Sequence, residues 1–278
     1  MSYTVSASDV KQLRELTGAG MMDCKKALIE AEGDIEKAIE NLRKKGQKIS
    51  AKRAARQAKE GAVIAIVNPE KTRGVVIRLS CETDFVAKNE DFVQMARNIA
   101  QIALDNFPQS KEELLNLPYD DKLSVGEKIT EQVGVIGEKI ELVDYRFIEA
   151  PVVSDYIHMG NKAGVIVGLN KAVEGAYEAG RNVAMQVAAM KPIAVDEGDV
   201  DQAIIDKEME IGMEQARREG KPEHLLENIA KGKVKKFLKE NTLLNQVYVR
   251  DGKMTVRQYL QSIDPELTVT AFEHLMLG

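Results

Sequence analysis

The sequence predicts an α+β fold, in which a helical N-terminal module precedes a core of two related subdomains. Three observations support this prediction. Short helical patterns fill residues 8–46, a strand–strand–helix pattern begins near residue 61 and again near residue 153, and residues 199–240 are helical throughout. Each strand–strand–helix pattern is typical of a small antiparallel sheet covered by a helix. The helical segment 199–240 is typical of a projecting helical hairpin.

Composition describes a globular protein with more than one domain. The chain has 278 residues, of which 44% are hydrophobic and 30% charged. No run approaches the roughly 18 apolar residues of a membrane span, and the N-terminus lacks the pattern of a signal peptide. Cys24 and Cys81 lie far apart and outside any CxxC motif, which suits two reduced thiols in the cytosol. Tryptophan is absent and aromatic residues make up only 5%, so a base-stacking surface is poorly supported.

The charge is unevenly distributed. Residues 1–60 hold 13 Lys and Arg against 9 Asp and Glu, whereas the rest of the chain holds 26 against 35. The basic excess is concentrated in Arg43, Lys44, Lys45, Lys48, Lys52, Arg53, Arg56 and Lys59. Such a run can contact RNA phosphates, but it is more often a solvated helix end and linker. Both interpretations stay open at this point.

Residues 8–46 are predicted to form three short helices. Ser8 is predicted to cap the first, and the segment from Thr17 to Gly20 ends it. The second stops at Gly33, and the third is capped by Asp34 and ends at Gly46. Three such helices bury little area, so this module is expected to dock onto something else. Residues 47–60 are basic and lack apolar periodicity, which is typical of a linker or a frayed helix.

The first core unit begins with strands at residues 61–67 and 74–79, joined by a turn at 68–72. An apolar stripe from Phe92 to Ala103 then predicts an amphipathic helix capped by Asn89. Further along the chain, we predict a short helical segment at 111–122, a helix and turn at 129–140 and a strand at 140–148.

The second core unit repeats this order. Strands are predicted at 153–158 and 164–169, and the helix that follows carries residues 181–184, which resemble residues 97–100. The helical hairpin at 199–240 turns at Gly220 and Pro222. The remainder is predicted to hold a strand at 246–249, a helix at 256–262 and a last strand near 267–272 that rejoins the second sheet.

The connection Thr83-Asp84-Phe85-Val86, between the second strand and the helix of the first unit, is unusual. Such a connection is normally polar, because it runs over the surface. One interpretation is that Asp84 caps a short helical turn while Phe85 fills the strand–helix corner. The other is that the loop presents an apolar wedge, with a carboxylate beside it, to a partner. The pattern does not separate them, although the second unit carries no equivalent of Phe85.

Signals for an enzyme are weak. The chain has no phosphate-binding glycine loop and no HExxH, and its three histidines, His158, His224 and His274, are scattered. A hydrolase that uses Cys24 or Cys81 is disfavoured, because no base stands at a recognisable spacing. We therefore expect a protein that acts by contact, without a cofactor or a metal of its own.

Two segments carry a resemblance to a known family. Residues 16–28, LTGAGMMDCKKAL, and residues 81–88, CETDFVAK, are similar to the signature stretches of bacterial elongation factor Ts. That family exchanges the guanine nucleotide of the GTPase elongation factor Tu. The resemblance covers nearly the whole chain. It implies a ubiquitin-associated-like three-helix module at 1–50, a basic linker at 51–60 and a core N-subdomain at 61–150. A core C-subdomain is implied at 151–198 and 241–278, with an antiparallel coiled-coil hairpin at 199–240.

The resemblance also assigns residues. In the family the TDFV loop enters the GTPase beside its nucleotide and disturbs the bound Mg²⁺, which implies a wedge made of Thr83, Asp84, Phe85 and Val86. The partner-binding residues it implies are Arg14, Met21, Met22, Lys25, Ile136 and His158.

The expected protein is thus a cytoplasmic, non-enzymatic exchange factor that binds elongation factor Tu and promotes GDP release. Its hairpin suggests a homodimer or a two-by-two complex, and no membrane or direct nucleic-acid contact is expected. The alternative is an RNA- or ribosome-associated protein that uses residues 43–59. Many bacterial members continue into a C-terminal helical module that also contacts the GTPase. Since this chain ends at Gly278, the resemblance predicts that this contact is absent.

Overall fold

The structure is a computed structural model in which residues 4–278 are described, and it confirms the α+β class. The chain forms two compact units. One comprises the chain up to Ile64 together with Ile77–Tyr145 and Met276–Gly278, and the other comprises Ala65–Val76 and Arg146–Leu275. The described residues contain two three-stranded sheets, with strand orders β1-β2-β3 and β4-β5-β6.

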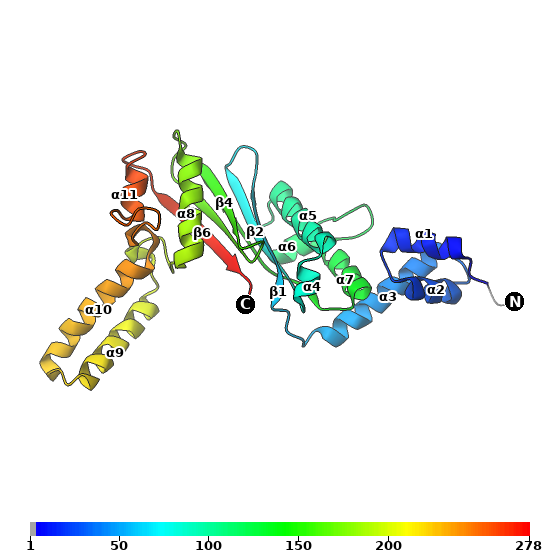
Figure 1. The fold of residues 1–278 in the computed structure, drawn as a ribbon, viewed down its shortest axis with the longest axis horizontal. Coiled ribbons are helices and arrows are strands. Elements are labelled where there is room, and N and C mark those ends of the chain that lie inside the picture. The colour runs from blue at the N-terminus through cyan, green and yellow to red at the C-terminus, as the bar shows by residue number, and fades with distance from the viewer. Residues whose placement is uncertain (1–3) are drawn as a thin grey trace. The chain divides into compact units, whose positions relative to one another are not determined.

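Three helices open the first unit: α1 (Ala7–Thr17), α2 (Met21–Glu30) and α3 (Ile35–Arg53) (Figure 1). Their small core is built from buried Leu13, Cys24 and Leu28, among others. The cap of α1 is Ser6 and not the predicted Ser8, because the Ser6 hydroxyl accepts the Asp9 N–H at 3.0 Å and the helix begins a residue earlier than Ser8. Asp34 caps α3 as predicted.

The predicted end of α3 at Gly46 is wrong, since the helix continues to Arg53. Gly46 instead lies where α3 crosses α7 (Val125–Ile136). A Cβ built on Gly134 of α7 would lie 2.7 Å from the Gly46 Cα, so the two backbones touch. The glycine serves close helix packing here, and a glycine inside a helix is tolerated when packing compensates for its low propensity.

The first sheet consists of β1 (Glu60–Val67), β2 (Arg73–Cys81) and β3 (Ile140–Glu149). Between β2 and β3 the chain forms the one-turn helix α4 (Asp84–Ala87), then α5 (Glu90–Asn106), α6 (Lys111–Asn116) and α7. Asn89 caps α5 by accepting the N–H groups of Asp91 and Phe92, as predicted. The apolar stripe of α5 is buried, as its periodicity predicts.

The second sheet consists of β4 (Val152–His158), β5 (Ala163–Leu169) and β6 (Val269–Met276). Strands β4 and β5 are antiparallel, with Val152 opposite Leu169 and His158 opposite Ala163. Helix α8 (Ala176–Met190) packs on both strands. The last strand joins this sheet, as predicted.

The predicted helical hairpin is confirmed: α9 (Gln202–Arg218) and α10 (Leu226–Asn241) lie side by side (Figure 1). Three short 3₁₀ turns at Glu197–Asp199, Glu223–Leu225 and Leu243–Asn245, and α11 (Val256–Gln261), complete the unit. The predicted strand at 246–249 is wrong. Its backbone is bound by the Gln186 side chain, which donates to the Val247 carbonyl at 3.1 Å and accepts the Val249 N–H at 2.8 Å. A side-chain amide thus replaces a neighbouring strand, and only an isolated bridge to Thr255 remains.

Candidate partner-binding site

The TDFV segment forms a one-turn helix that stands out from the first unit. Thr83 has extended backbone and is the N-cap of α4, so the predicted capping role of Asp84 is wrong. Asp84 lies in the first turn and pairs with Lys88 at 2.6 Å, and this hydrogen bond lowers the pKa of its carboxyl. No residue of α4 is buried.

Phe85 is 84% exposed, the largest value among the large hydrophobic side chains of the described residues. The interpretation in which it fills the strand–helix corner is therefore wrong. Burying a phenylalanine contributes about 1.5–3 kcal/mol, a stabilisation that this side chain does not realise within its own chain. A single exposed apolar side chain is ordinary on a protein surface, so the importance of Phe85 depends on the groove that it lines.

A groove of about 630 Å³ lies beside this side chain. It brings Phe85 and Val86 together with Ile136, which ends α7 and is the fifth of the six predicted contact residues. The rest of its lining is not predicted as part of a site by the sequence. These residues are Gly18, Asn89, Asp91, Phe92, Gln94, Met95, Asn98, Tyr119, Lys128, Gln132 and Val135. The groove can therefore receive an apolar segment next to the phenylalanine.

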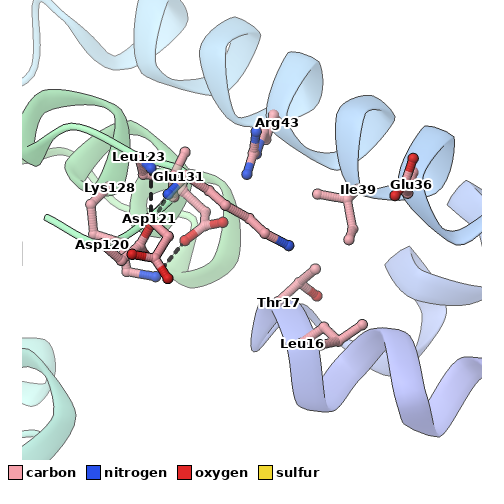
Figure 2. Close-up of a pocket in the computed structure, with 11 residues that line it drawn as sticks. Leu16, Thr17, Glu36, Ile39, Arg43, Asp120, Asp121, Leu123, Lys128 and Glu131 are labelled. Carbon is pink, nitrogen blue, oxygen red and sulfur yellow. Dashed lines mark hydrogen bonds and ion pairs between the residues drawn. The ribbon is translucent and has the colours of Figure 1, made fainter. Parts of the chain in front are cut away.

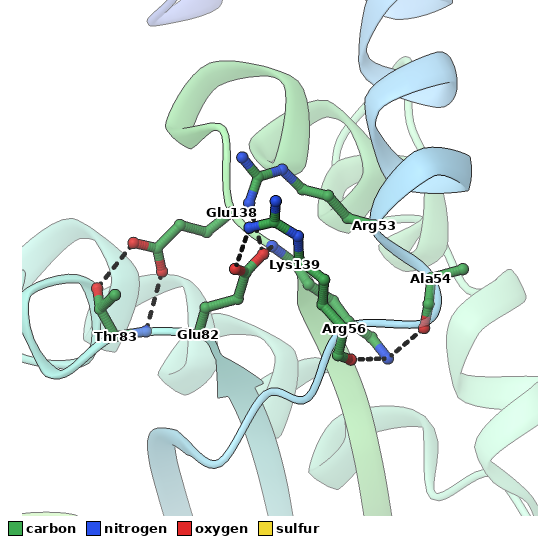
Figure 3. A network of polar contacts seen from close by, with 7 residues as sticks. All are labelled: Arg53, Ala54, Arg56, Glu82, Thr83, Glu138 and Lys139. Atoms are coloured by element: carbon green, nitrogen blue, oxygen red, sulfur yellow. Dashed lines mark hydrogen bonds and ion pairs between the residues drawn. The ribbon is translucent and has the colours of Figure 1, made fainter.

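Two glutamates anchor the base of α4 (Figure 3). The Glu138 carboxylate accepts the Thr83 N–H at 3.1 Å and the Thr83 hydroxyl at 2.7 Å. The Glu82 carboxylate accepts the Lys139 N–H at 2.6 Å. The chain at the start of α4 (Glu82 and Thr83) and the chain that follows α7 (Glu138 and Lys139) are thus joined reciprocally, each by the other's carboxylate.

The same network reaches the end of α3. Arg53 and Arg56 donate to the two carboxylate oxygens of Glu82 at 2.6 and 3.0 Å, and the Lys139 ammonium donates to the carbonyls of Ala54 and Arg56 (Figure 3). Burial alone would raise the pKa of Glu82. The Lys139 N–H and the two guanidinium groups outweigh it and lower this pKa to about 2.

Half of the cations of the basic segment are therefore engaged within the protein. Besides Arg53 and Arg56, Lys44 pairs with Glu40 at 2.6 Å and Lys45 pairs with Asp23 at 2.5 Å. Four of the eight cations of this segment are thus neutralised by carboxylates, which weakens a continuous phosphate-binding surface.

The N-terminal helices carry a second exposed apolar face. Met21 and Met22 at the start of α2 are 61% and 63% exposed. Leu16 of α1 and Ile29 of α2 are exposed as well. The predicted contact residues Arg14 and Lys25 are also exposed. Neither methionine fills the small core, so both are accessible to a partner.

A mixed-charge pocket of about 450 Å³ lies between α1, α3 and the chain that leads into α7 (Figure 2). Three of its charged side chains have partners within the protein. Lys128 pairs with Glu131 at 2.5 Å, and Asp120 accepts the N–H groups of Lys122 and Leu123. We assign no ligand to it.

The sixth predicted contact residue, His158, belongs to the second unit, where it ends β4 and is half-buried. Its Nδ1 lies 3.0 Å from the Tyr156 hydroxyl, which orients the ring.

Both thiols are buried. Burial, followed by the charges of Glu138 and Glu60, raises the pKa of Cys81 to about 12, and burial also raises the pKa of Cys24. Neither thiol is a thiolate at neutral pH, which disfavours a cysteine nucleophile. Across residues 4–278, no cluster of three or more potential metal ligands occurs, and none of the helices is long and apolar enough to cross a membrane.

Comparison with known proteins agrees with the motifs. A family model described as Elongation factor TS matches residues 82–278. The protein named Elongation factor Ts from Christiangramia forsetii is 57% identical over 274 residues, which cover 99% of each chain. The protein of the same name from Flavobacterium psychrophilum is 52% identical over 275 residues, again covering 99% of each. That from Clostridium acetobutylicum is 44% identical over 269 residues, or 95% of this chain and 88% of the relative.

The matching model spans more than half of the chain, and the relatives align over nearly all of it. The chain therefore belongs to the elongation factor Ts family of translation elongation factors.

Proposed function

We propose that this protein is the guanine nucleotide exchange factor of elongation factor Tu, and that it acts by binding, without catalysing a chemical reaction. The observation that carries the proposal is the exposure of Phe85 on α4, the segment that matches the family's TDFV motif. Thr83, Asp84, Phe85 and Val86 form the wedge in this proposal.

The mechanism follows from the demands of the partner's Mg²⁺. This ion bridges GDP to the GTPase and requires near-ideal octahedral geometry. Insertion of the phenylalanine beside the nucleotide shifts the groups that support the ion, and each 1.4 kcal/mol of lost nucleotide affinity corresponds to a tenfold change. The exposed ring is buried only in the open, nucleotide-free complex. It therefore shifts the equilibrium towards that state.

Docking is assigned to the surfaces around the wedge. Ile136 shares a groove with Phe85, and Arg14, Met21, Met22 and Lys25 form the exposed face of the N-terminal helices. His158 of the second unit is proposed to contact the GTPase near its phosphate-binding side.

The assembly and the compartment are proposed from the family. The hairpin α9–α10 would join two copies in a homodimer or a two-by-two complex with elongation factor Tu. The site of action would be the cytoplasm, where translation elongation takes place. We propose no membrane contact and no direct contact with nucleic acid. The alternative RNA-binding function is disfavoured, because Lys44, Lys45, Arg53 and Arg56 are already paired with carboxylates.

The test is the release of a fluorescent GDP analogue from elongation factor Tu. The parent protein is expected to accelerate release, and Phe85→Ala is expected to reduce this acceleration roughly 10- to 100-fold, because about 1.5–3 kcal/mol of apolar burial is lost from the open complex. Val247→Ala is the matched control, since Val247 is an exposed apolar residue of the other unit.

Binding of the parent without accelerated release would overturn the proposal. RNA affinity that falls when Lys44, Lys45, Lys52 and Arg53 are neutralised, with no effect on GDP release, would support the alternative function.

A further inference from the structure

Packing holds the wedge only in part, since Val86 and Ala87 are half-buried while Asp84 and Phe85 are exposed. None of the four residues of α4 is buried, and a helix of one turn has almost no intrinsic stability. Its own cap is weak as well, since the Thr83 hydroxyl lies 3.5 Å from the Val86 N–H that it accepts. Something outside the segment must therefore fix the direction in which Phe85 points.

Glu138 supplies two strong bonds at the point where α4 begins. Its two carboxylate oxygens accept the N–H and the O–H of Thr83 separately, at 3.1 and 2.7 Å. An ionised acceptor makes hydrogen bonds that are roughly twice as strong as those between neutral groups. Because the backbone N–H and the hydroxyl of one residue are both engaged, Thr83 cannot rotate about its own backbone without breaking one of them.

Glu138 is itself placed by the helix that lines the groove. Helix α7 ends at Ile136, and Gly137, with φ of 78°, turns the chain so that the next residue faces the end of β2. The Lys139 N–H then donates to Glu82, which fixes the backbone on the far side of Glu138 (Figure 3). The acceptor of Thr83 is thus held on both sides along the chain.

We infer that Glu138 is a positioning residue for nucleotide exchange: it holds Thr83, so that Phe85 and Ile136 are presented together. This inference rests on the proposed function, and it adds to it a residue that makes no contact with the partner in the proposed mechanism. Without this carboxylate, α4 frays and Phe85 samples many directions. Docking through the N-terminal helices remains, but in fewer encounters with the GTPase does the Phe85 ring enter beside the nucleotide.

The test compares Glu138→Ala and Glu138→Gln with Glu141→Gln. Glu141 stands three residues further along, near the start of β3, and its carboxylate is paired with Lys139 at 2.9 Å. At saturating concentration, Glu138→Ala is expected to slow GDP release about tenfold, and Glu138→Gln about threefold, because the amide oxygen still accepts one of the two bonds. The concentration for half-maximal effect is expected to stay within about twofold of that of the parent, and Glu141→Gln is expected to match the parent in both respects.

A double-mutant cycle separates positioning from a merely structural role. If Glu138 acts through the wedge, adding Glu138→Ala to Phe85→Ala produces little further loss. Independent losses that multiply would overturn the inference. Should the alanine variant fail to fold, the same cycle is run with Glu138→Gln.

Amide hydrogen exchange tests the positioning without the partner. The amides of Thr83 and Val86 are expected to exchange faster in Glu138→Gln and at the parental rate in Glu141→Gln. Unchanged exchange at both amides would refute the inference. If the parent does not accelerate GDP release but these amides do respond, the proposed function fails while the anchoring of Thr83 by Glu138 holds.

Discussion

At the scale of single residues, one segment of four positions reverses the usual rule that charged side chains are exposed and apolar side chains are buried. Glu82 is a charged residue whose side chain is only 15% exposed, whereas Phe85 is 84% exposed. The glutamate tolerates this position because a backbone N–H and two guanidinium groups replace the water it loses. The phenylalanine has no such partner within the chain. The first residue serves the fold and the second is available to another molecule.

The first prediction concerns the pH dependence of Glu82. Its pKa of about 2 in the folded state lies below the ordinary value of 4.5, so the ionised carboxylate stabilises the fold above about pH 4.5. This stabilisation is lost as the pH falls towards 2. We expect Glu82→Gln to lower the free energy of unfolding at pH 7 by up to about 3 kcal/mol, and this deficit to shrink steadily below pH 4.5.

Urea unfolding of the parent and the variant at several pH values is the measurement. Glu210→Gln, at an exposed position of α9, is the control and is expected to remain within about 0.5 kcal/mol of the parent. A deficit of Glu82→Gln that persists unchanged at pH 2 would show that the charge of Glu82 is not what stabilises the fold.

At the scale of elements, the contact between α3 and α7 attaches the N-terminal helices to the rest of their unit. Gly46 and Gly134 allow the two helix backbones to touch. Their sequence context does not distinguish this use from helix termination, because glycine is common in both places. Whether such a glycine ends a helix or allows close helix packing depends on the helix that lies against it.

The second prediction uses this contact. A Cβ at position 134 would lie 2.7 Å from the Gly46 Cα and 3.3 Å from its nitrogen, and neither backbone atom can move aside cheaply. Gly134→Ala is therefore expected to destabilise the protein by about 1–3 kcal/mol, although alanine favours helix formation by about 1 kcal/mol.

Gly232→Ala in α10 is the opposite case. A Cβ built there meets nothing within 4 Å, so only the helix propensity changes and stability should rise by about 0.5–1 kcal/mol. Thermal unfolding of both variants checks the pair. If both substitutions raised the melting temperature, the backbones of α3 and α7 would not be in the close contact that Gly46 and Gly134 indicate.

At the scale of the whole molecule, the chain divides into two units, each with its own buried core. Both cysteines lie in the first unit, within the chain up to Ile64 and in Ile77–Tyr145. Both are buried, so their reactivity reports on the opening of that unit alone. Tyr156, Tyr177, Tyr248 and Tyr259 lie in the second unit, so tyrosine signals, unlike the thiols, include a contribution from that unit.

The third prediction follows from this division. A thiol reagent at pH 8 should label almost none of the native protein within minutes and two thiols per chain in denaturant. If the units unfold separately, the labelling of thiols and the change in tyrosine signal will occur at different urea concentrations. Rapid labelling of one thiol in the native protein would contradict the burial of both.

By itself, the sequence determined the class of fold and the order of the elements. Alternating and helical apolar periodicity does not depend on what packs against it, so the two strand–strand–helix units, the hairpin α9–α10 and the caps Asp34 and Asn89 were predictable. The TDFV segment was also recognisable, because four adjacent residues carry the motif. Most of the confirmed predictions are of this local kind; the pairing of the last strand with the second sheet is a long-range one.

The tertiary structure alone decided how these residues are used. Phe85 is exposed because no neighbouring element covers it, and Gly46 continues a helix because Gly134 meets it. The backbone at 246–249 is not a strand because the Gln186 side chain binds it. Glu138 stands 55 positions from Thr83, a separation that carries no periodic signal. Contacts between residues so far apart depend on the packing of the whole unit, and local propensity cannot specify them.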